Sequence, residues 1–87
     1  MNVTVVESTT LSKIAYDYAR RLLELEFRSG ASYQYFGVPA DVYEALLRAD
    51  SKGRYFNQAI RGWFPYRLVP NVNADALDAG VRAAWRK

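Results

Sequence analysis

The chain has 87 residues, of which 51% are hydrophobic and 15% aromatic, and its formal net charge is +3. This length suits one domain with one core, and the hydrophobic content is too high for a disordered chain. Because the sequence contains no cysteine and no histidine, it has no disulfide, no thiol nucleophile and neither the commonest general base nor the commonest metal ligand. We therefore expect no enzymatic activity, no metal and no cofactor.

The first ten residues lack the basic start and long apolar run of a signal peptide. No apolar stretch approaches the roughly 20 residues that a membrane-spanning helix needs. These two features predict a cytoplasmic protein with no membrane partner. The modest positive charge is compatible with an anionic partner.

The first half of the chain carries the alternating pattern of β-strands. Residues 11–18, 23–27 and 32–36 each place apolar or aromatic side chains at every second position. Short turns at 19–21 and 28–31 join these segments, the second with Gly30, so we predict a three-stranded antiparallel meander. Val3 and Val5 indicate a candidate fourth strand at the N-terminus.

The second half of the chain carries helical spacing. Pro39 suits the start of a helix over residues 40–49, whose central apolar stripe would be Val42, Leu46 and Ala49. Ser51 is a good N-cap for a shorter helix over 52–60. In that helix we expect Phe56, Ala59 and Ile60 to face inward, with Gly62 beyond its end. Two prolines exclude a helix across 63–70, which we expect to be extended.

The last segment is predicted to be a further helix. Asn73 would cap it, and Leu77, Val81 and Trp85 fall on one side at helical spacing over residues 74–86. This stripe would either dock on the body or bind another chain. The predicted fold is α+β: a meander covered on one face by two helices, with a domain at 1–70 and a C-terminal helical extension at 71–87.

Several short segments occur in an order that resembles the KTSC domain. They are Leu11–Asp17, Leu23–Phe27, Gly30, Tyr33-Gln34-Tyr35, Val38-Pro39, Ser51-Lys52-Gly53, Phe56-Asn57 and Ile60-Arg61. The resemblance covers roughly residues 6–66, and its central signature is the pair Tyr33 and Tyr35. Each segment is weak by itself, and the ordered set is specific.

The resemblance implies several further expectations. The KTSC domain is named for a C-terminal extension of some lysyl-tRNA synthetases, and it also occurs as small stand-alone bacterial and phage proteins. By resemblance, the family motif residues in this chain are Tyr33, Tyr35, Ser51, Gly53, Phe56 and Asn57. The synthetase context implies a nucleic-acid-binding role.

A basic and aromatic stretch is the best functional candidate. Residues 51–73 contain four cationic side chains and no acidic one, with five aromatic residues interleaved. Cations that follow phosphates and rings that stack on bases are the components of a single-strand binder. The predicted nucleic-acid-binding residues are Lys52, Arg54, Tyr55, Arg61, Trp63 and Arg67.

Each of these residues also has a structural interpretation. Ser51, Lys52 and Gly53 would either bind a phosphate at a helix N-terminus or simply cap and pack that helix. Tyr33 and Tyr35 would either form an exposed stacking platform or, as we favour, pack under the first helix. Glu24 and Glu26 share a face, which we interpret as a solvated strand face rather than an acid–base pair.

The sequence therefore predicts a non-catalytic module that binds RNA or another single-stranded nucleic acid. The alternative is a protein–protein interaction module, in which Trp63, Phe64, Tyr66 and the C-terminal helix meet a protein partner or a second copy of the chain. A small hydrolase is the weakest alternative, because the usual catalytic residues are missing.

Overall fold

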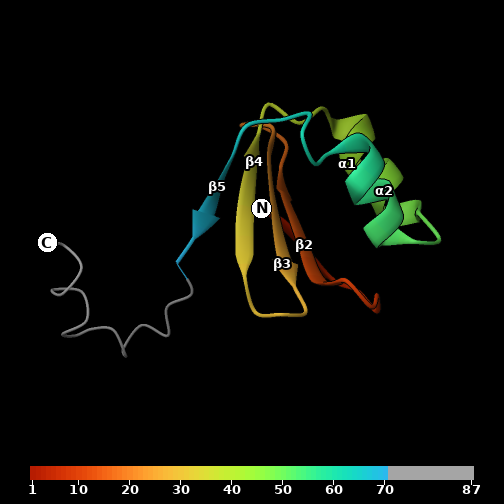
Figure 1. Ribbon diagram of the computed structural model, residues 1–87. Helices are drawn as coiled ribbons and strands as arrows, with labels where there is room; N and C mark the ends of the chain where they lie inside the picture. Colours follow the sequence, from red (N-terminus) through yellow and green to blue (C-terminus); the bar gives the residue numbers. More distant parts are fainter. Residues whose placement is uncertain (71–87) are drawn as a thin grey trace, which may run out of the picture.

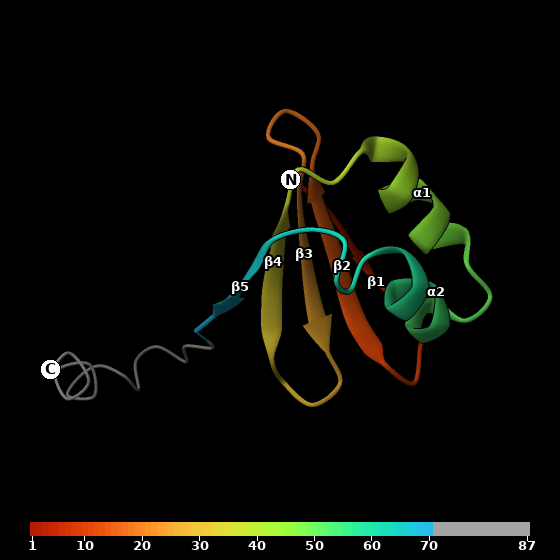
Figure 2. The ribbon, with the colours of Figure 1, turned by 45° about the horizontal axis from the view of Figure 1, so that its top comes forward.

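A single antiparallel sheet of five strands, in the order β1-β2-β3-β4-β5, organises the fold. The computed structural model describes residues 1–70. Its elements are β1 (Asn2–Val5), β2 (Leu11–Asp17), β3 (Leu22–Phe27), β4 (Ser32–Phe36), α1 (Ala40–Arg48), α2 (Lys52–Ala59) and β5 (Tyr66–Val69). The two helices lie together on one side of the sheet (Figures 1 and 2). The predicted α+β class and the meander are confirmed, the candidate N-terminal strand is β1, and β5 is added to the prediction.

The register explains why alternating residues form one apolar face. Ile14 pairs with Leu25, and Leu25 pairs with Tyr33 on the next strand. Tyr16, Leu23 and Tyr35 form the neighbouring row in the same way. Since side chains alternate between the faces of a strand, all six point to the side that the helices cover.

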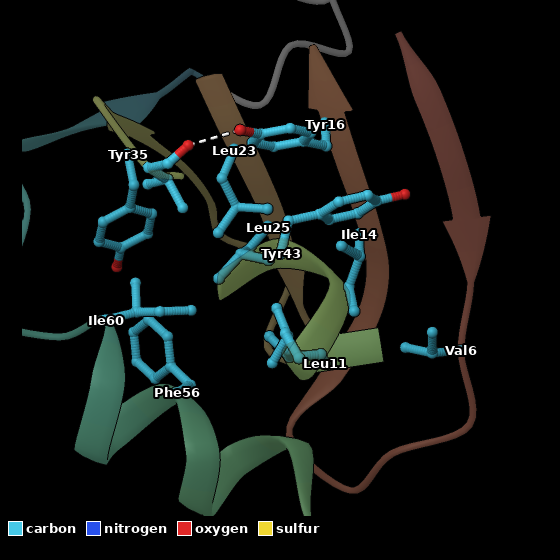
Figure 3. Close-up of a cluster of buried hydrophobic side chains, with 12 residues drawn as sticks. Val6, Leu11, Ile14, Tyr16, Leu23, Leu25, Tyr35, Tyr43, Phe56 and Ile60 are labelled. Carbon is cyan, nitrogen blue, oxygen red and sulfur yellow. Dashed lines mark hydrogen bonds between the residues drawn. The ribbon is translucent and has the colours of Figure 1, made fainter. Parts of the chain in front are cut away.

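The core lies between this sheet face and the helices (Figure 3). Ile14, Leu23 and Leu25 are fully buried there, and α2 with the residue after it contributes Phe56 and Ile60, as predicted. The predicted stripe of α1 is wrong in one detail, because Tyr43 and Leu46 are buried whereas Val42 is only partly buried. The reason is a ring stack: the Tyr43 ring lies 4.4 Å from that of Tyr16, centroid to centroid.

Residues 63–70 depart from the prediction of one extended segment. The chain turns through 60–63 after α2, and only Tyr66–Val69 is extended. These four residues form β5, which pairs with β4 so that Tyr66 lies opposite Tyr35 and Leu68 opposite Tyr33. Pro65 and Pro70 fall just outside the strand, where the missing N–H groups do not interrupt the ladder.

A row of polar side chains crosses the middle of the other face of the sheet. The Gln34 side chain donates to Glu24 at 3.2 Å and accepts from the Arg67 guanidinium at 3.1 Å. Lys13 and Glu26 form an ion pair at 3.3 Å beside this row. Glu24 and Glu26, predicted to lie on a solvated strand face, are half-buried and engaged by Gln34 and Lys13.

The predicted C-terminal helix, with Asn73, Leu77, Val81 and Trp85, lies outside the described residues, and so does the predicted extension at 71–87. Within residues 1–70, neither helix is long and apolar enough to cross a membrane.

Candidate functional site

A pocket of about 460 Å³ opens between α2 and the β4–β5 end of the sheet. It is lined by Phe27, Tyr33, Tyr35, Phe56, Arg61, Gly62 and Tyr66. We call this the aromatic pocket. Its volume lies within the range of sites that hold small molecules.

Strand alternation and pairing bring the rings together. Tyr33 and Tyr35 lie two residues apart on the inner face of β4, and pairing places Tyr66 of β5 beside Tyr35, at 5.7 Å between ring centroids. From the opposite side, Phe56 of α2 meets the Tyr35 ring at 5.7 Å and 74°, an edge-to-face contact. The chain then leaves α2 through Gly62, whose φ of 84° favours glycine. This turn returns the chain to the sheet and completes the pocket.

Tyr35 forms the floor of the pocket and Tyr66 its rim. Tyr35 is only 5% exposed, whereas Tyr66 is 61% exposed. Figure 3 shows the Tyr35 ring directed toward Phe56 and Ile60. Within residues 1–70 the Tyr35 hydroxyl has no hydrogen-bond partner. A buried polar group without a partner is unusual in a folded protein. The floor of the pocket therefore contains a hydroxyl that is able to form a hydrogen bond with a ligand.

The electrostatics of the pocket centre on Tyr35 and Arg61. The pKa of Tyr35 is raised to about 12, mainly by burial and also by the neighbouring Tyr33 and Tyr66, while the Arg61 guanidinium opposes this rise. Arg61 is exposed and donates weakly to Asn57 at 3.4 Å. No acidic residue lines the described pocket. The pocket therefore offers aromatic walls, phenol hydroxyls and one accessible positive charge.

One of the predicted nucleic-acid-binding residues lines this pocket, and another follows it closely in the chain. Arg61 lines it, and Trp63 follows immediately after Gly62. Trp63 is 70% exposed, and its indole N–H donates to the Gln58 carbonyl at 2.9 Å, which fixes the ring on the surface. Arg61 is accessible at the pocket, and Trp63 is accessible on the surface.

Lys52 has a structural role in this fold. Its ammonium donates to the carbonyls of Leu47 and Ala49, each at 3.0 Å, and so binds the C-terminal end of α1. The hollow of about 240 Å³ beside it is lined in part by Glu7 and Asp50. These two carboxylates disfavour a phosphate at this position.

Ser51 and Gly53 also serve packing. The Ser51 hydroxyl accepts from the Arg54 backbone N–H at 3.2 Å, as an N-cap does. A Cβ on Gly53 would lie 2.4 Å from the Thr10 hydroxyl oxygen, so only glycine lets α2 approach the start of β2 this closely. These contacts account for the Ser51-Lys52-Gly53 motif without a ligand.

The remaining predicted residues do not converge on one surface. Arg54 lies in the first turn of α2, whereas Arg61 lies in the turn that follows the other end of that helix. Tyr55 packs against the core, and Arg67 bonds to Gln34 on the opposite face of the sheet. The predicted basic stretch is thus divided among three parts of the molecule.

The two tyrosines of the family motif pack, as we favoured, but not under α1. Tyr35 is buried and Tyr33 partly buried, and both contact the rings on the α2 side. The place beneath α1 is taken by Tyr16, which stacks on Tyr43. Of the other motif residues, Phe56 forms a wall of the aromatic pocket and Asn57 accepts from Arg61.

Sequence reasoning did not identify Phe27 and Tyr66 as pocket residues. The alternation of β3 indicates that Phe27 faces inward, but its proximity to Phe56, 5.3 Å between centroids, depends on how α2 docks. Tyr66 reaches the pocket only because β5 pairs with β4. Within residues 1–70, no group of three or more acidic side chains lies close enough to hold a metal ion.

Comparison with known proteins gives consistent matches. The family model of the KTSC domain matches residues 7–64. An uncharacterized protein of Stutzerimonas stutzeri is 46% identical over 61 residues, which cover 70% of this chain and 86% of that protein. The lysine–tRNA ligase of Nostoc punctiforme is 40% identical over 63 residues, 72% of this chain but only 11% of the ligase.

A solved structure matches the fold as well. The crystal structure of a KTSC domain protein from Yersinia pestis aligns with a TM-score of 0.75 at 38% identity, covering 79% of this chain and 97% of that protein. The range matched by the family model contains every lining residue of the aromatic pocket except Tyr66.

Proposed function

The chain belongs to the KTSC domain family, and from this premise we propose that it is a non-catalytic module that binds single-stranded RNA at the rim of the aromatic pocket. The observation that carries the proposal is the lining of this pocket, in which five aromatic rings surround an opening beside the Arg61 guanidinium. Aromatic rings stack on bases of any sequence, and an arginine pairs with phosphate in a planar, bidentate manner.

Two further features support the proposal. Tyr66 lines the opening with an exposed ring, and Trp63, which follows the lining residue Gly62 in the chain, exposes a second ring for stacking. The lysine–tRNA ligases that share this domain are named for a reaction on tRNA, although the chain spans only 11% of their length. The network of Arg67, Gln34 and Glu24 lies on the other sheet face, and its carboxylate makes that face less suited to a phosphate backbone.

The test is the salt dependence of RNA binding by the full chain. A short single-stranded RNA with a fluorescent label is titrated at several salt concentrations, and affinity should fall steeply as salt rises. Arg61→Gln should flatten the slope by about 0.7, because one fewer phosphate contact releases counterions. Trp63→Ala should instead cost about 1–3 kcal/mol at every salt concentration, since stacking is not screened.

Arg67→Gln is the matched control, because it removes the same charge from the opposite face of the sheet. It should leave affinity and slope close to those of the wild type. Absence of RNA binding at low salt, or an equal loss in Arg61→Gln and Arg67→Gln, would contradict the proposal.

A second candidate function rests on a separate observation. Trp63, Tyr66 and Leu68 all expose apolar surface along the α2–β5 side, and such surface is typical of a protein interface. A protein partner or a second copy of the chain would bury it. Binding of that kind would show little salt dependence, and sedimentation of the full chain at rising concentration would detect a homodimer.

A further inference from the structure

We infer that the aromatic pocket receives one unpaired base of the RNA strand, with the Tyr35 hydroxyl bonding the polar edge of the base and Arg61 holding the attached phosphate. This inference rests on the proposed function and adds what the pocket itself recognises. RNA binding at the rim requires only stacking and charge. Recognition inside the pocket requires a ligand whose shape and polarity match its floor.

The first argument is the unpaired hydroxyl of Tyr35 at the floor of the pocket. The Tyr35 side chain is buried, lines the pocket, and has no hydrogen-bond partner for its hydroxyl within residues 1–70. Leaving such a group unpaired destabilises the protein, and a ligand that supplies a partner recovers that energy. The pocket therefore favours a ligand that carries a donor or an acceptor at its inner end.

The second argument is the shape of the walls. Tyr66 and Tyr33 lie on one side of the Tyr35 ring, at 5.7 and 6.4 Å between centroids, and Phe56 meets it from the α2 side. Rings at these positions accommodate a flat, polarisable body by stacking and edge contacts. A nucleobase is flat and has polar atoms along its edge, so it fits both the walls and the floor.

The third argument is charge. Arg61 is the one charged residue that lines the pocket in the described part of the chain, and it is exposed at the opening. A ligand with a flat inner part and a negatively charged outer part would stack on the aromatic walls and pair with the Arg61 guanidinium. A nucleotide has this arrangement, because its phosphate is attached through the sugar at a distance from the polar edge of the base.

Mononucleotides test this inference directly. The four ribonucleoside 5′-monophosphates are titrated into the full chain while two-dimensional NMR follows the tyrosine ring signals, and ribose 5-phosphate serves as the ligand without a base. At least one mononucleotide should bind and shift the Tyr35 ring signals, whereas ribose 5-phosphate should not. Tyr35→Phe should weaken this binding about tenfold, equivalent to about 1.4 kcal/mol.

Tyr18→Phe is the matched control, since it removes a hydroxyl that bonds Glu44 at an exposed position away from the pocket. It should bind mononucleotides as the wild type does. Tyr66→Leu provides a second variant at the exposed rim, where folding is not at risk, and should weaken binding about fivefold or more through lost stacking.

The outcomes separate the inference from the proposed function. If RNA binds with the expected Arg61 dependence but no mononucleotide binds and Tyr35→Phe binds RNA like the wild type, the inference is wrong and the proposed function stands. If no RNA binds at low salt, both are wrong. If N-acetyltryptophan, a flat ring with a carboxylate, binds more tightly than every mononucleotide, the pocket is a peptide site and the inference is wrong.

Discussion

Tyr35 connects the core of this protein to its pocket. One part of its ring packs among Phe56, Tyr33 and Tyr66, and its hydroxyl remains unpaired within the described residues. A phenylalanine would fill the same volume without a polar group to satisfy. The hydroxyl is therefore a feature that packing alone does not explain, and we assign it to ligand recognition.

The stability of the protein should depend on Tyr35 at alkaline pH. The folded protein raises the pKa of Tyr35 from 10.0 to about 12, because burial disfavours the charged phenolate. A group whose pKa is raised on folding contributes stability that is complete below the unfolded value of about 10 and is lost as pH rises toward 12. Urea midpoints should therefore fall between pH 10 and 12, and Tyr35→Phe should fall less over that range.

Comparing the wild type with Tyr35→Phe isolates the contribution of Tyr35 to the loss of stability between pH 10 and 12, because every other ionisable group is the same in both proteins. At pH 7, Tyr35→Phe should be as stable as the wild type or up to about 1 kcal/mol more stable, because an unpaired hydroxyl is removed. A loss of stability at pH 7 would mean that the hydroxyl has a partner in the folded protein.

At the scale of elements, Lys52 connects the two helices. Its side chain starts at the first residue of α2 and donates to the last carbonyls of the α1 region. The carbonyls at a helix C-terminus carry partial negative charge and lack partners within the helix, so an ammonium there stabilises the helix end. Lys52 thus links the start of α2 to the end of α1 through these two hydrogen bonds.

We expect Lys52→Gln to lower the free energy of unfolding by about 1–2 kcal/mol, because two charge-assisted hydrogen bonds are lost. Arg54→Gln, two residues away and exposed, should change it by less than about 0.5 kcal/mol. Thermal or urea unfolding measures both. Unchanged stability of Lys52→Gln, together with weakened RNA binding, would restore the interpretation of Lys52 as a phosphate contact.

The strands and helices differ in how far the sequence determines them. β2 to β4 and both helices were predictable to within one residue at each end, since alternation and helical spacing are local signals. β5 was not recognised as a strand, because Tyr66–Val69 is short, flanked by prolines, and stabilised by pairing with β4 across residues 37–65. That pairing is a property of the tertiary structure.

The same distinction applies to the candidate site. The composition of residues 51–73 indicated aromatic and basic chemistry, and of the predicted binding residues Arg61 lines the pocket. The sequence did not show that Arg67 points to the opposite sheet face or that the Lys52 ammonium is engaged, since both depend on contacts between elements. It also did not show that Phe27 and Tyr66 join Tyr33 and Tyr35 around one opening.

At the scale of the whole molecule, one sheet face and two helices enclose a single core. Leu25 lies at its centre: it is fully buried on the middle strand and pairs with Ile14 on one side and Tyr33 on the other. The described part of the chain holds one core cluster. A disruption at Leu25 therefore affects the whole fold.

We expect Leu25→Asp to unfold the protein, because a carboxylate would be buried without a partner in this core. Circular dichroism during heating should show no cooperative transition for this variant. Glu24→Asp, at the adjacent position on the polar face, is the control and should melt like the wild type within a few degrees. A cooperative transition in Leu25→Asp would contradict the placement of Leu25 at the centre of the core.

The position of β5 has a consequence for the motions of the molecule. Within residues 1–70 this strand has four residues, a ladder on one side only, and three side chains that are mostly in solvent. Elements with few buried contacts open at lower free energy than the core they adjoin. β5 can therefore detach while β2, β3 and the helices stay folded, and Tyr66 moves with it. The pocket then has one wall that moves by local fraying of a single strand, without unfolding of the domain.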